Sequence, residues 1–326
     1  MKLSANSPSI IALSGGIGGA KLALGLSRFM PQEQLLIVGN TGDDFEHLGL
    51  HISPDLDTLM YTLSGKADTK KGWGLANESW ECMQALERLG GETWFKLGDN
   101  DLATHLERTR RLRDGESLTE ITSDYCRRFG ILTRIVPISN DSVRTIVETE
   151  DGDMEFQVYF VREQCKAVVK GFHFEGADQA KPNPVFLDAL RHPSLKAVVI
   201  CPSNPFLSID PILAVRGVRE ELRRCPVPVI GVSPIVGGDA VKGPTARILR
   251  ELGHSVSAVA VANYYRDFLD GFVLDIQDEN TVEEILQLGI AVEVTNTLMT
   301  DLSTKTELAK IVMEFSDSCG KRCTGF

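Results

Sequence analysis

The sequence predicts an α/β protein with a three-layer, Rossmann-like core and a mainly parallel sheet. Short apolar runs recur near both ends of the chain, and glycine or proline follows most of them, as is typical of buried parallel strands. The first run leads into a glycine turn, an amphipathic stretch and a second run, which is the βαβ pattern. The middle of the chain favours helices instead.

The N-terminal unit begins with residues 9–14 (SIIALS), which we expect to form a strand. The helical spacing of Leu22, Leu26 and Phe29 predicts a helix after the glycine turn. Residues 35–39 (LLIVG) are expected to form the second strand.

Later strands are predicted at residues 195–201, 227–233, 256–261, 272–276 and 291–294, and a closing helix at 303–315. The loops that follow parallel strands meet at the carboxyl edge of the sheet, where open α/β proteins bind ligands. We therefore expect the ligand site at this edge.

The middle of the chain predicts a separate unit. Residues from about 56 to 130 favour helices, one of them opened by a capping box at 117–120. Runs at 143–149 and 154–161 flank an Asp-Gly turn and predict a β-hairpin. The expected domains are a core at 1–60 and 180–326, and a mostly helical insertion with the hairpin at 61–179.

Composition limits the class of partner. The 326 residues include 34 Lys and Arg against 45 Asp and Glu, which gives a net charge of −11. A nucleic-acid backbone requires a cationic face, so we expect small-molecule substrates and no nucleic acid. No apolar run approaches the ~20 residues that cross a bilayer, and the N-terminal residues lack a signal-peptide pattern. We expect a cytoplasmic protein without a membrane partner.

Cysteine usage agrees with that compartment. The seven cysteines are scattered and include no CxxC motif: Cys82, Cys126, Cys165, Cys201, Cys225, Cys319 and Cys323. We expect reduced thiols. A metal site at the closely spaced last two is an alternative, although two ligands do not make a closed zinc site.

The glycine turn (SGGIGGAK, 14–21) predicts an anion site. Glycines after a buried strand let backbone amides approach an anion at a helix N-terminus, and a lysine in the first turn would add positive charge. The candidate nucleotide-binding residues are Gly15, Gly16, Gly18, Gly19 and Lys21. The spacing matches neither a P-loop nor GxGxxG, and a tight packing turn is the alternative.

Four carboxylates follow in residues 40–57. Asp43 and Asp44 are adjacent, so one of them can point toward a site, whereas Asp55 and Asp57 lie in the first turn of a predicted helix. Complementing the helix dipole is their alternative role. Four such groups are costly unless a cation compensates, and Mg²⁺ takes one or two carboxylates plus substrate phosphates. The pattern predicts metal-assisted phosphoryl transfer.

Two later loops, 202–205 and 233–238, offer hydroxyl, amide and backbone groups suited to a nucleotide base, or are ordinary βα turns. The candidate residues are Ser203, Asn204, Pro205, Ser233, Pro234 and Ile235.

A set of motifs then points to a known family. SGGIGGAK, NTGDD, ISPDLDT, KLGDNDLATH, PSNPFLSIDPIL, VSPIVGGDAVKGP, NYYRDFLDGFVLD and TLMTD occur in this order over nearly the whole chain. Together they resemble the 2-phospho-L-lactate transferase (CofD) family of coenzyme F420 biosynthesis.

The resemblance implies a Mg²⁺-dependent, usually homodimeric transferase. In its reaction, the ribityl hydroxyl of the deazaflavin Fo attacks the phosphorus of a guanosine-diphosphate-activated phospho-acid, GMP leaves, and the unglutamylated coenzyme F420 precursor forms. Phospholactate, phosphoenolpyruvate and 3-phosphoglycerate remain alternatives for the acid.

The resemblance also implies roles for particular residues. Asp57 and Lys96 match positions associated with Fo binding, and the two late loops match the guanine-nucleotide side. Asp44 and Asp57 are the candidate catalytic residues, and Asp44, Asp55 and Asp57 are the candidate metal ligands. The sequence does not distinguish which of them acts as the general base and which binds the metal. Two positions depart from the common pattern: Ile17 replaces a threonine, and Asn140 stands where an aspartate pair is frequent.

Two other functions compete. The first is a YvcK-like, nucleotide-sugar-binding regulatory protein without transferase activity, which would share the fold. The second is an NAD-dependent dehydrogenase, which the glycine spacing disfavours, as does Gly39-Asn40 at the end of the second strand where an acidic residue is expected.

Overall fold

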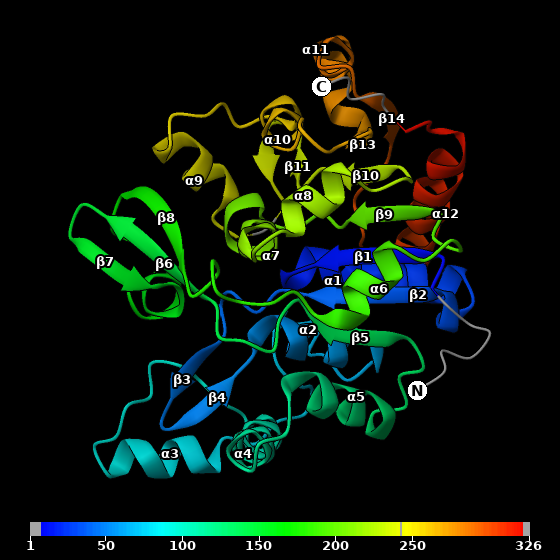
Figure 1. Ribbon diagram of the computed structural model, residues 1–326. Coiled ribbons are helices and arrows are strands. Elements are labelled where there is room, and N and C mark those ends of the chain that lie inside the picture. The colour runs from blue at the N-terminus through cyan, green and yellow to red at the C-terminus, as the bar shows by residue number, and fades with distance from the viewer. Residues whose placement is uncertain (1–7, 242, 322–326) are drawn as a thin grey trace.

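A single parallel sheet of seven strands forms the centre of the molecule (Figure 1). The computed structural model of the protein describes residues 8–241 and 243–321. The strand order is β14-β13-β10-β9-β1-β2-β5, and every pairing within this sheet is parallel. The strands are β1 (Ile10–Ser14), β2 (Leu35–Gly39), β5 (Arg134–Pro137), β9 (Ala197–Ile200), β10 (Val229–Val232), β13 (Gly271–Asp275) and β14 (Ala291–Thr295). The predicted Rossmann-like α/β class is confirmed.

Both faces of this sheet are buried, which explains the uninterrupted apolar runs. In β1, Ile11 and Leu13 belong to the core on one face, and Ile10 and Ala12 to the core on the other. One face is covered by α1 (Gly16–Phe29), α2 (Pro54–Leu63), α5 (Leu118–Arg128) and α12 (Leu302–Ser318). The other face is covered by α6 (Pro184–Leu190), α7 (Asp210–Ala214), α8 (Val218–Arg223), α9 (Thr245–Glu251), α10 (Ala258–Tyr264) and α11 (Val282–Gln287).

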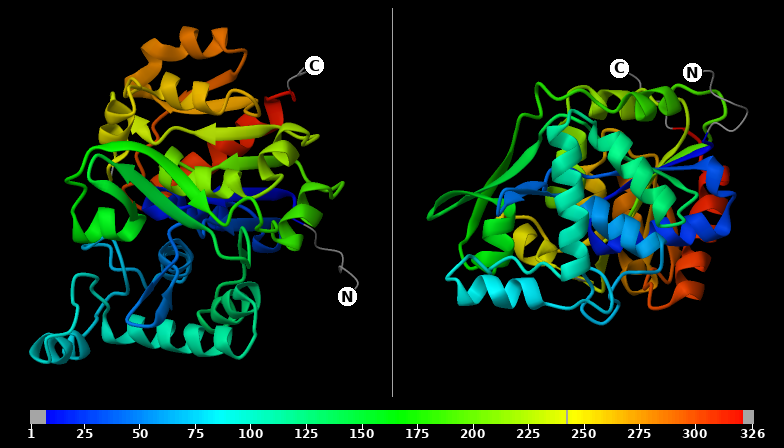
Figure 2. Two further views of the ribbon diagram at one scale, coloured as in Figure 1. Left: turned by 60° about the vertical axis from the view of Figure 1, so that its left-hand side comes forward. Right: turned by 90° about the horizontal axis from the view of Figure 1, so that it is seen from below.

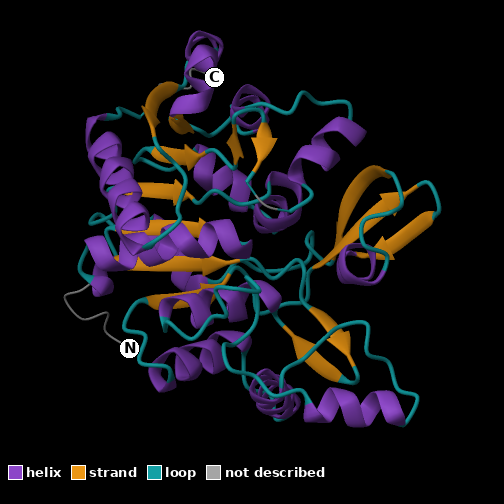
Figure 3. Ribbon diagram, turned by 180° about the vertical axis from the view of Figure 1, so that it is seen from behind, coloured by secondary structure: helices purple, strands orange, loops and turns teal. Residues whose placement is uncertain are grey.

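Two smaller units stand beyond the carboxyl edge of the sheet, toward which its strands point (Figures 1 and 3). One contains the hairpin β3 (Phe45–His47) and β4 (Leu50–Ile52) with α3 (Glu81–Arg88) and α4 (Asp99–Arg113), and these helices form the outermost layer at that end (Figure 2). The other is an antiparallel sheet of β6 (Arg144–Thr149), β7 (Gly152–Glu155) and β8 (Val169–Glu175).

Several predicted elements differ from the structure. The predicted hairpin forms as β6 and β7, but its second strand ends at Glu155, and a π-helical turn, η2 (Val158–Arg162), follows because Phe156 and Tyr159 bury at helical spacing. The predicted strand at 256–261 is instead the start of α10, where Ser257 accepts a hydrogen bond from the amide of Ala260. The capping box opening α5 is confirmed.

The predicted domain boundaries stay a prediction. One strand of the main sheet, β5, nevertheless lies inside the range 61–179 that we expected to be an insertion. Its Ile135 and Val136 bury on opposite faces of the sheet, so this short segment extends the core beside β2.

The predictions about cysteines and membrane-spanning segments are compared with the described residues. The six described cysteines are free thiols, and Cys323 of the alternative metal site with Cys319 lies outside the described residues. In the part of the chain that the structure describes, no helix combines the length and apolar character needed to cross a bilayer. The cytoplasmic location and the homodimer stay predictions.

A partly buried carboxyl ties the main core to α10. Asp210 begins α7 directly after η3 (Pro205–Ile209), and it accepts a hydrogen bond from the hydroxyl of Tyr264. Burial raises the pKa of Asp210 to about 7, while the Tyr264 hydrogen bond and the charge of Arg219 act in the opposite direction.

This raised pKa predicts a pH-dependent stability. Between about pH 4 and about pH 7 the folded protein holds a proton on Asp210 that the unfolded chain releases, so stability should fall as pH rises through this window. Each unit of raised pKa corresponds to about 1.4 kcal/mol. The free energy of unfolding in urea, measured at several pH values, should vary less for Asp210→Asn than for the parent. Equal pH dependence of the two proteins would contradict the assignment.

Candidate active site

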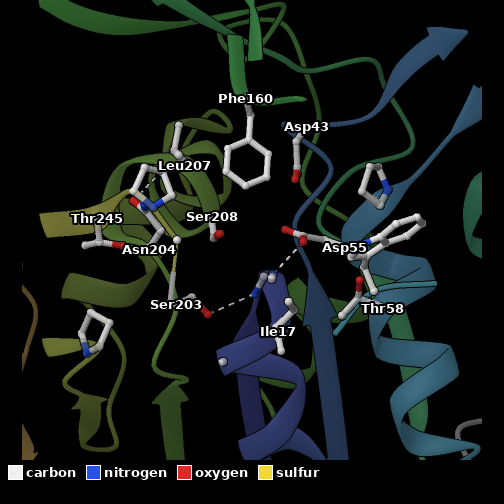
Figure 4. A pocket seen from close by; sticks show the side chains of 18 of the residues that line it. Ile17, Asp43, Asp55, Thr58, Phe160, Ser203, Asn204, Leu207, Ser208 and Thr245 are labelled. Carbon is white, nitrogen blue, oxygen red and sulfur yellow. Dashed lines mark hydrogen bonds between the residues drawn. The ribbon is translucent and has the colours of Figure 1, made fainter. Parts of the chain in front are cut away.

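A cavity of about 730 Å³ lies at the carboxyl edge of the main sheet, between the core and both smaller units. Its floor is the glycine turn after β1, and Figure 4 shows Asp43, Asp55 and Thr58 on one side of it and Ser203, Asn204 and Ser208 on the other. The location agrees with the expected ligand site of an open α/β sheet.

The glycine turn provides free amides at the start of α1. The amide of Gly15 donates to Ser203 Oγ at 3.2 Å, and that of Gly16 donates to Asp55 Oδ1 at 2.6 Å. The next two amides, of Ile17 and Gly18, have no hydrogen-bond partner among the described residues. Free amides at a helix N-terminus bind anions.

Close packing explains why glycine is required here. A β-carbon on Gly15 would lie 2.6 Å from both Asp55 Oδ2 and Ser208 Cβ, and one on Gly18 would lie 2.3 Å from the carbonyl oxygen of Pro202. The tight packing turn and the anion site are therefore compatible, because the turn packs closely and its residues also line the cavity.

Of the other residues in the glycine turn, some line the cavity and one lies behind its wall. Lys21 lines the cavity and donates from Nζ to the carbonyl oxygen of Met299 at 3.1 Å. Gly19 lies behind the wall, against Ser14 and Ser203. The side chain of Ile17, where a threonine is commoner, lines the cavity.

Two carboxylates face the cavity, Asp43 and Asp55, and both are more than nine-tenths buried. Asn40 Nδ2 donates to both of them, at 3.0 Å to Asp55 Oδ2. Burial raises the pKa of Asp55 to about 6, and burial with repulsion from Asp55 and Asp44 raises the pKa of Asp43 well above its ordinary value. No described lysine, arginine or histidine lies within 4 Å of either carboxylate.

Asp44, a candidate catalytic residue and metal ligand, lies outside the main cavity. Its Oδ2 accepts a hydrogen bond from Ser53 Oγ at 2.9 Å and lies 3.2 Å from His51 Nε2. The adjacent Asp43 is the member of the pair that lines the main cavity, and the catalytic and metal-binding roles of Asp44 stay predictions.

Asp57, the other candidate catalytic residue, does not line the cavity either. Both of its carboxylate oxygens accept hydrogen bonds from the guanidinium of Arg108, a fully buried side chain of α4. His105 Nδ1 lies 3.7 Å from the same carboxylate. This geometry gives Asp57 a role in the packing of α2 against α4, and its roles in catalysis, Fo binding and metal binding stay predictions.

The two late loops reach the cavity only in part. Ser203, Asn204, Ser233 and Pro234 line it, whereas Pro205 and Ile235 are buried behind. The side-chain oxygen of Asn204 accepts hydrogen bonds from the amides that open η3. Asn140, which departs from the common pattern, caps the start of α5 through Thr119 and is not among the lining residues.

Opposite these loops, Lys96 lines the cavity among aromatic side chains that sequence reasoning missed. They are Trp73, Trp94 and Phe95 from the segment around α3, with Lys71 beside them. Phe156 and Phe160 near η2 add a further apolar wall. Their only sequence signal was the aromatic pair directly before Lys96.

The donor groups fit a magnesium ion that shares its ligands with a substrate. Among the described residues, no three His, Cys, Asp or Glu side chains converge on one point. The buried carboxylates Asp43 and Asp55 face the same cavity as the free amides of Ile17 and Gly18. Mg²⁺ typically takes one or two carboxylates and completes its shell with water and phosphate oxygens, so these two residues are the suitable pair.

The fold and the cavity define an α/β protein with a site at the carboxyl edge of its sheet, where helix-terminal amides and buried carboxylates meet. A family model described as 2-phospho-L-lactate transferase CofD matches residues 10–314. The chain therefore belongs to the 2-phospho-L-lactate transferase CofD family, a family of transferases.

Individual relatives agree with this membership. A phosphoenolpyruvate transferase of Kitasatospora aureofaciens is 40% identical, over 94% of this chain and 98% of its own. A 2-phospho-L-lactate transferase of Methanosarcina mazei is 39% identical, over 94% and 99%. A crystal structure of a UPF0052-family protein of Bacillus halodurans matches with a TM-score of 0.63 and 15% identity, over 94% and 99%, which shows the fold alone.

Removal of the Asp57 charge should destabilise the fold. In Asp57→Asn the buried guanidinium of Arg108 loses its charged partner, so the free energy of unfolding in urea should fall by about 3 kcal/mol or more. Asp114→Asn is the matched control, because Asp114 pairs with Arg110 of the same helix on the surface, where a pair contributes about 0–1 kcal/mol. Equal losses in the two variants would contradict the structural role of Asp57.

Proposed function

We propose that this protein transfers the phospho-acid moiety of a guanosine-diphosphate-activated donor to the deazaflavin Fo, releasing GMP and forming the unglutamylated coenzyme F420 precursor. One observation carries the proposal most directly. A single cavity joins free helix-terminal amides, a buried carboxylate pair and an aromatic wall that includes Lys96.

The diphosphate belongs at the glycine turn. The free amides of Ile17 and Gly18, the positive end of the α1 dipole and Lys21 all favour negative charge there. The nucleoside then extends toward the loops that carry Ser203 and Ser233, where hydroxyl and backbone groups line the wall.

The acceptor belongs at the aromatic wall. Fo is a flat, largely apolar tricycle with a polar ribityl tail, and such ligands bind between apolar walls with a few fixed polar groups. Trp73, Trp94 and Phe95 supply the apolar wall, and Lys96 and Thr58 supply polar groups at its edge.

The reaction then requires in-line positioning. The ribityl oxygen forms a bond to the phosphorus next to the acid, the bond from that phosphorus to the GMP oxygen breaks, and the hydroxyl proton passes to a base. The free amides hold the phosphoryl oxygens through the step. Mg²⁺, when held by Asp43 and Asp55, would supply charge neutralisation on the diphosphate.

The names of the relatives do not identify the phospho-acid of the donor, because they include two different acids. Phosphoenolpyruvate transferases and 2-phospho-L-lactate transferases match this chain at 40% and 39% identity. Because these values are nearly equal, overall similarity does not select the donor.

Single-turnover reactions test the proposal. The protein is mixed with Mg²⁺, Fo and each guanosine-diphosphate-activated acid in turn, namely phospholactate, phosphoenolpyruvate and 3-phosphoglycerate. We expect one of them to give the corresponding product mass together with one equivalent of GMP. Failure of all three donors to modify Fo would overturn the proposal.

Lys96→Ala separates acceptor from donor binding. Loss of a charged hydrogen-bond donor costs about 1.5–3 kcal/mol, so the KM for Fo should rise by about tenfold or more. The Kd of GDP, measured by calorimetry, should stay within about twofold, because Lys96 belongs to the aromatic wall and not to the loops of Ser203 and Ser233 that we assign to the nucleotide. Lys310→Ala, on the surface of α12, is the matched control. Loss of GDP affinity with an unchanged KM for Fo would reverse the assignment of the two sides.

A further inference from the structure

A third wall of the cavity is formed by the segment around η2, and it is assigned to neither the nucleotide nor Fo. Phe156, Gln157, Phe160, Val161 and Gln164 all line the cavity. This wall belongs to neither the nucleotide loops nor the aromatic wall around Lys96.

Gln157 is the unusual member of this wall. It lies at the N-cap of η2, and only 5% of its surface is exposed. Among the described residues no side-chain hydrogen bond involves Gln157, and its amide is not among the fully enclosed polar groups, because Gln157 lines the cavity. The amide is therefore available to a ligand in the cavity as donor and acceptor.

The surroundings of Gln157 place that partner near the reacting phosphorus. Gln157 and Asp43 line the main cavity together, and they also share a small adjoining pocket. Figure 4 shows the ring of Phe160 between Ser208 and Asp43, pointing into the cavity. Ser208 is 7% exposed and follows the nucleotide loop.

The wall around η2 is the part of the cavity that we assign to the acid of the donor. The phosphorus under attack carries three groups that differ in direction: the GMP oxygen, the incoming ribityl oxygen and the ester oxygen of the acid. The first is assigned to the loops of Ser203 and Ser233, and the second to the wall of Lys96. The wall that carries Gln157 is assigned to neither of these groups, and it lies beside Asp43 at the carboxylate end of the cavity.

We propose that Gln157 is a specificity-determining residue that hydrogen-bonds the carboxyl group of the phospho-acid in the donor. The inference rests on the proposed function, since it assumes a donor that carries such an acid. An amide suits this position because it donates to a carboxylate without adding a charge that would pair with Asp43 instead. The stacked rings of Phe156 and Phe160, 5.4 Å apart, form the apolar surface beside it for the carbon skeleton of the acid.

Calorimetry with three ligands isolates the contact. The ligands are GDP, its β-(1-carboxyethyl) ester, which is the phospholactate donor, and its β-ethyl ester, which lacks only the carboxyl group. The parent should bind the carboxyethyl ester more tightly than the ethyl ester. In Gln157→Leu this preference should fall by about tenfold, while the Kd values of GDP and the ethyl ester stay within about twofold. Gln287→Leu, an exposed position of α11, is the control.

Gln157→Glu keeps the inference falsifiable if the leucine variant fails to fold. It retains the size of the side chain and should reverse the preference, because a second carboxylate would repel that of the donor. A parent-like preference in either folded variant, or an equal loss for all three ligands, overturns the role of Gln157. These binding measurements require no turnover, so a parent that binds the donor but never modifies Fo would contradict the proposed function and leave the contact established.

Discussion

The hydrogen bond from the amide of Gly16 to the carboxylate of Asp55 is the contact on which the site depends. At 2.6 Å it joins the start of α1 to the start of α2, so two helices that follow different strands begin at the same point. Because a side chain at Gly15 would collide with this carboxylate, the glycine turn and the aspartate motif constrain each other. The same carboxylate accepts from Asn40 at the end of β2, which fixes all three segments around one end of the cavity.

The charges around this contact favour a bound ligand. Asp43 and Asp55 are buried together, and burial raises the pKa of both carboxyls because it disfavours their charged forms. A few ångströms along the same floor, the amides of Ile17 and Gly18 have no described partner. Buried carboxylates beside helix-terminal amides in one cavity are typical of a functional site that the rest of the fold must stabilise. The buried pair of Asp57 and Arg108 contributes to that support by holding α4 against α2.

Much of this arrangement could be predicted from the sequence because it is local. The strand, glycine turn and helix at residues 10–29 follow from periodicity and glycine placement, and the loops after β9 and β10 meet the cavity as a parallel sheet requires. Which single carboxylates line the cavity could not be predicted from the sequence, for a geometric reason. Residues two apart on a helix point about 200° away from each other, so Asp57 turns away when Asp55 faces the cavity, and Thr58 shares the face of Asp55. The η2 wall depends on tertiary contacts that no spacing in the sequence indicates.

Asp43 and Asp55 line the cavity, whereas Asp44 and Asp57 do not line it and bind Ser53 and Arg108. We therefore expect the first pair to act on the ligand. The most direct test is the effect of Mg²⁺ on GDP binding, measured by calorimetry for the parent and for the four single Asp→Asn variants at these positions. Mg²⁺ should tighten GDP binding in the parent, in Asp44→Asn and in Asp57→Asn, and this effect should be lost in Asp43→Asn and Asp55→Asn. A magnesium effect that survives in Asp43→Asn and Asp55→Asn but disappears in Asp57→Asn would contradict the account.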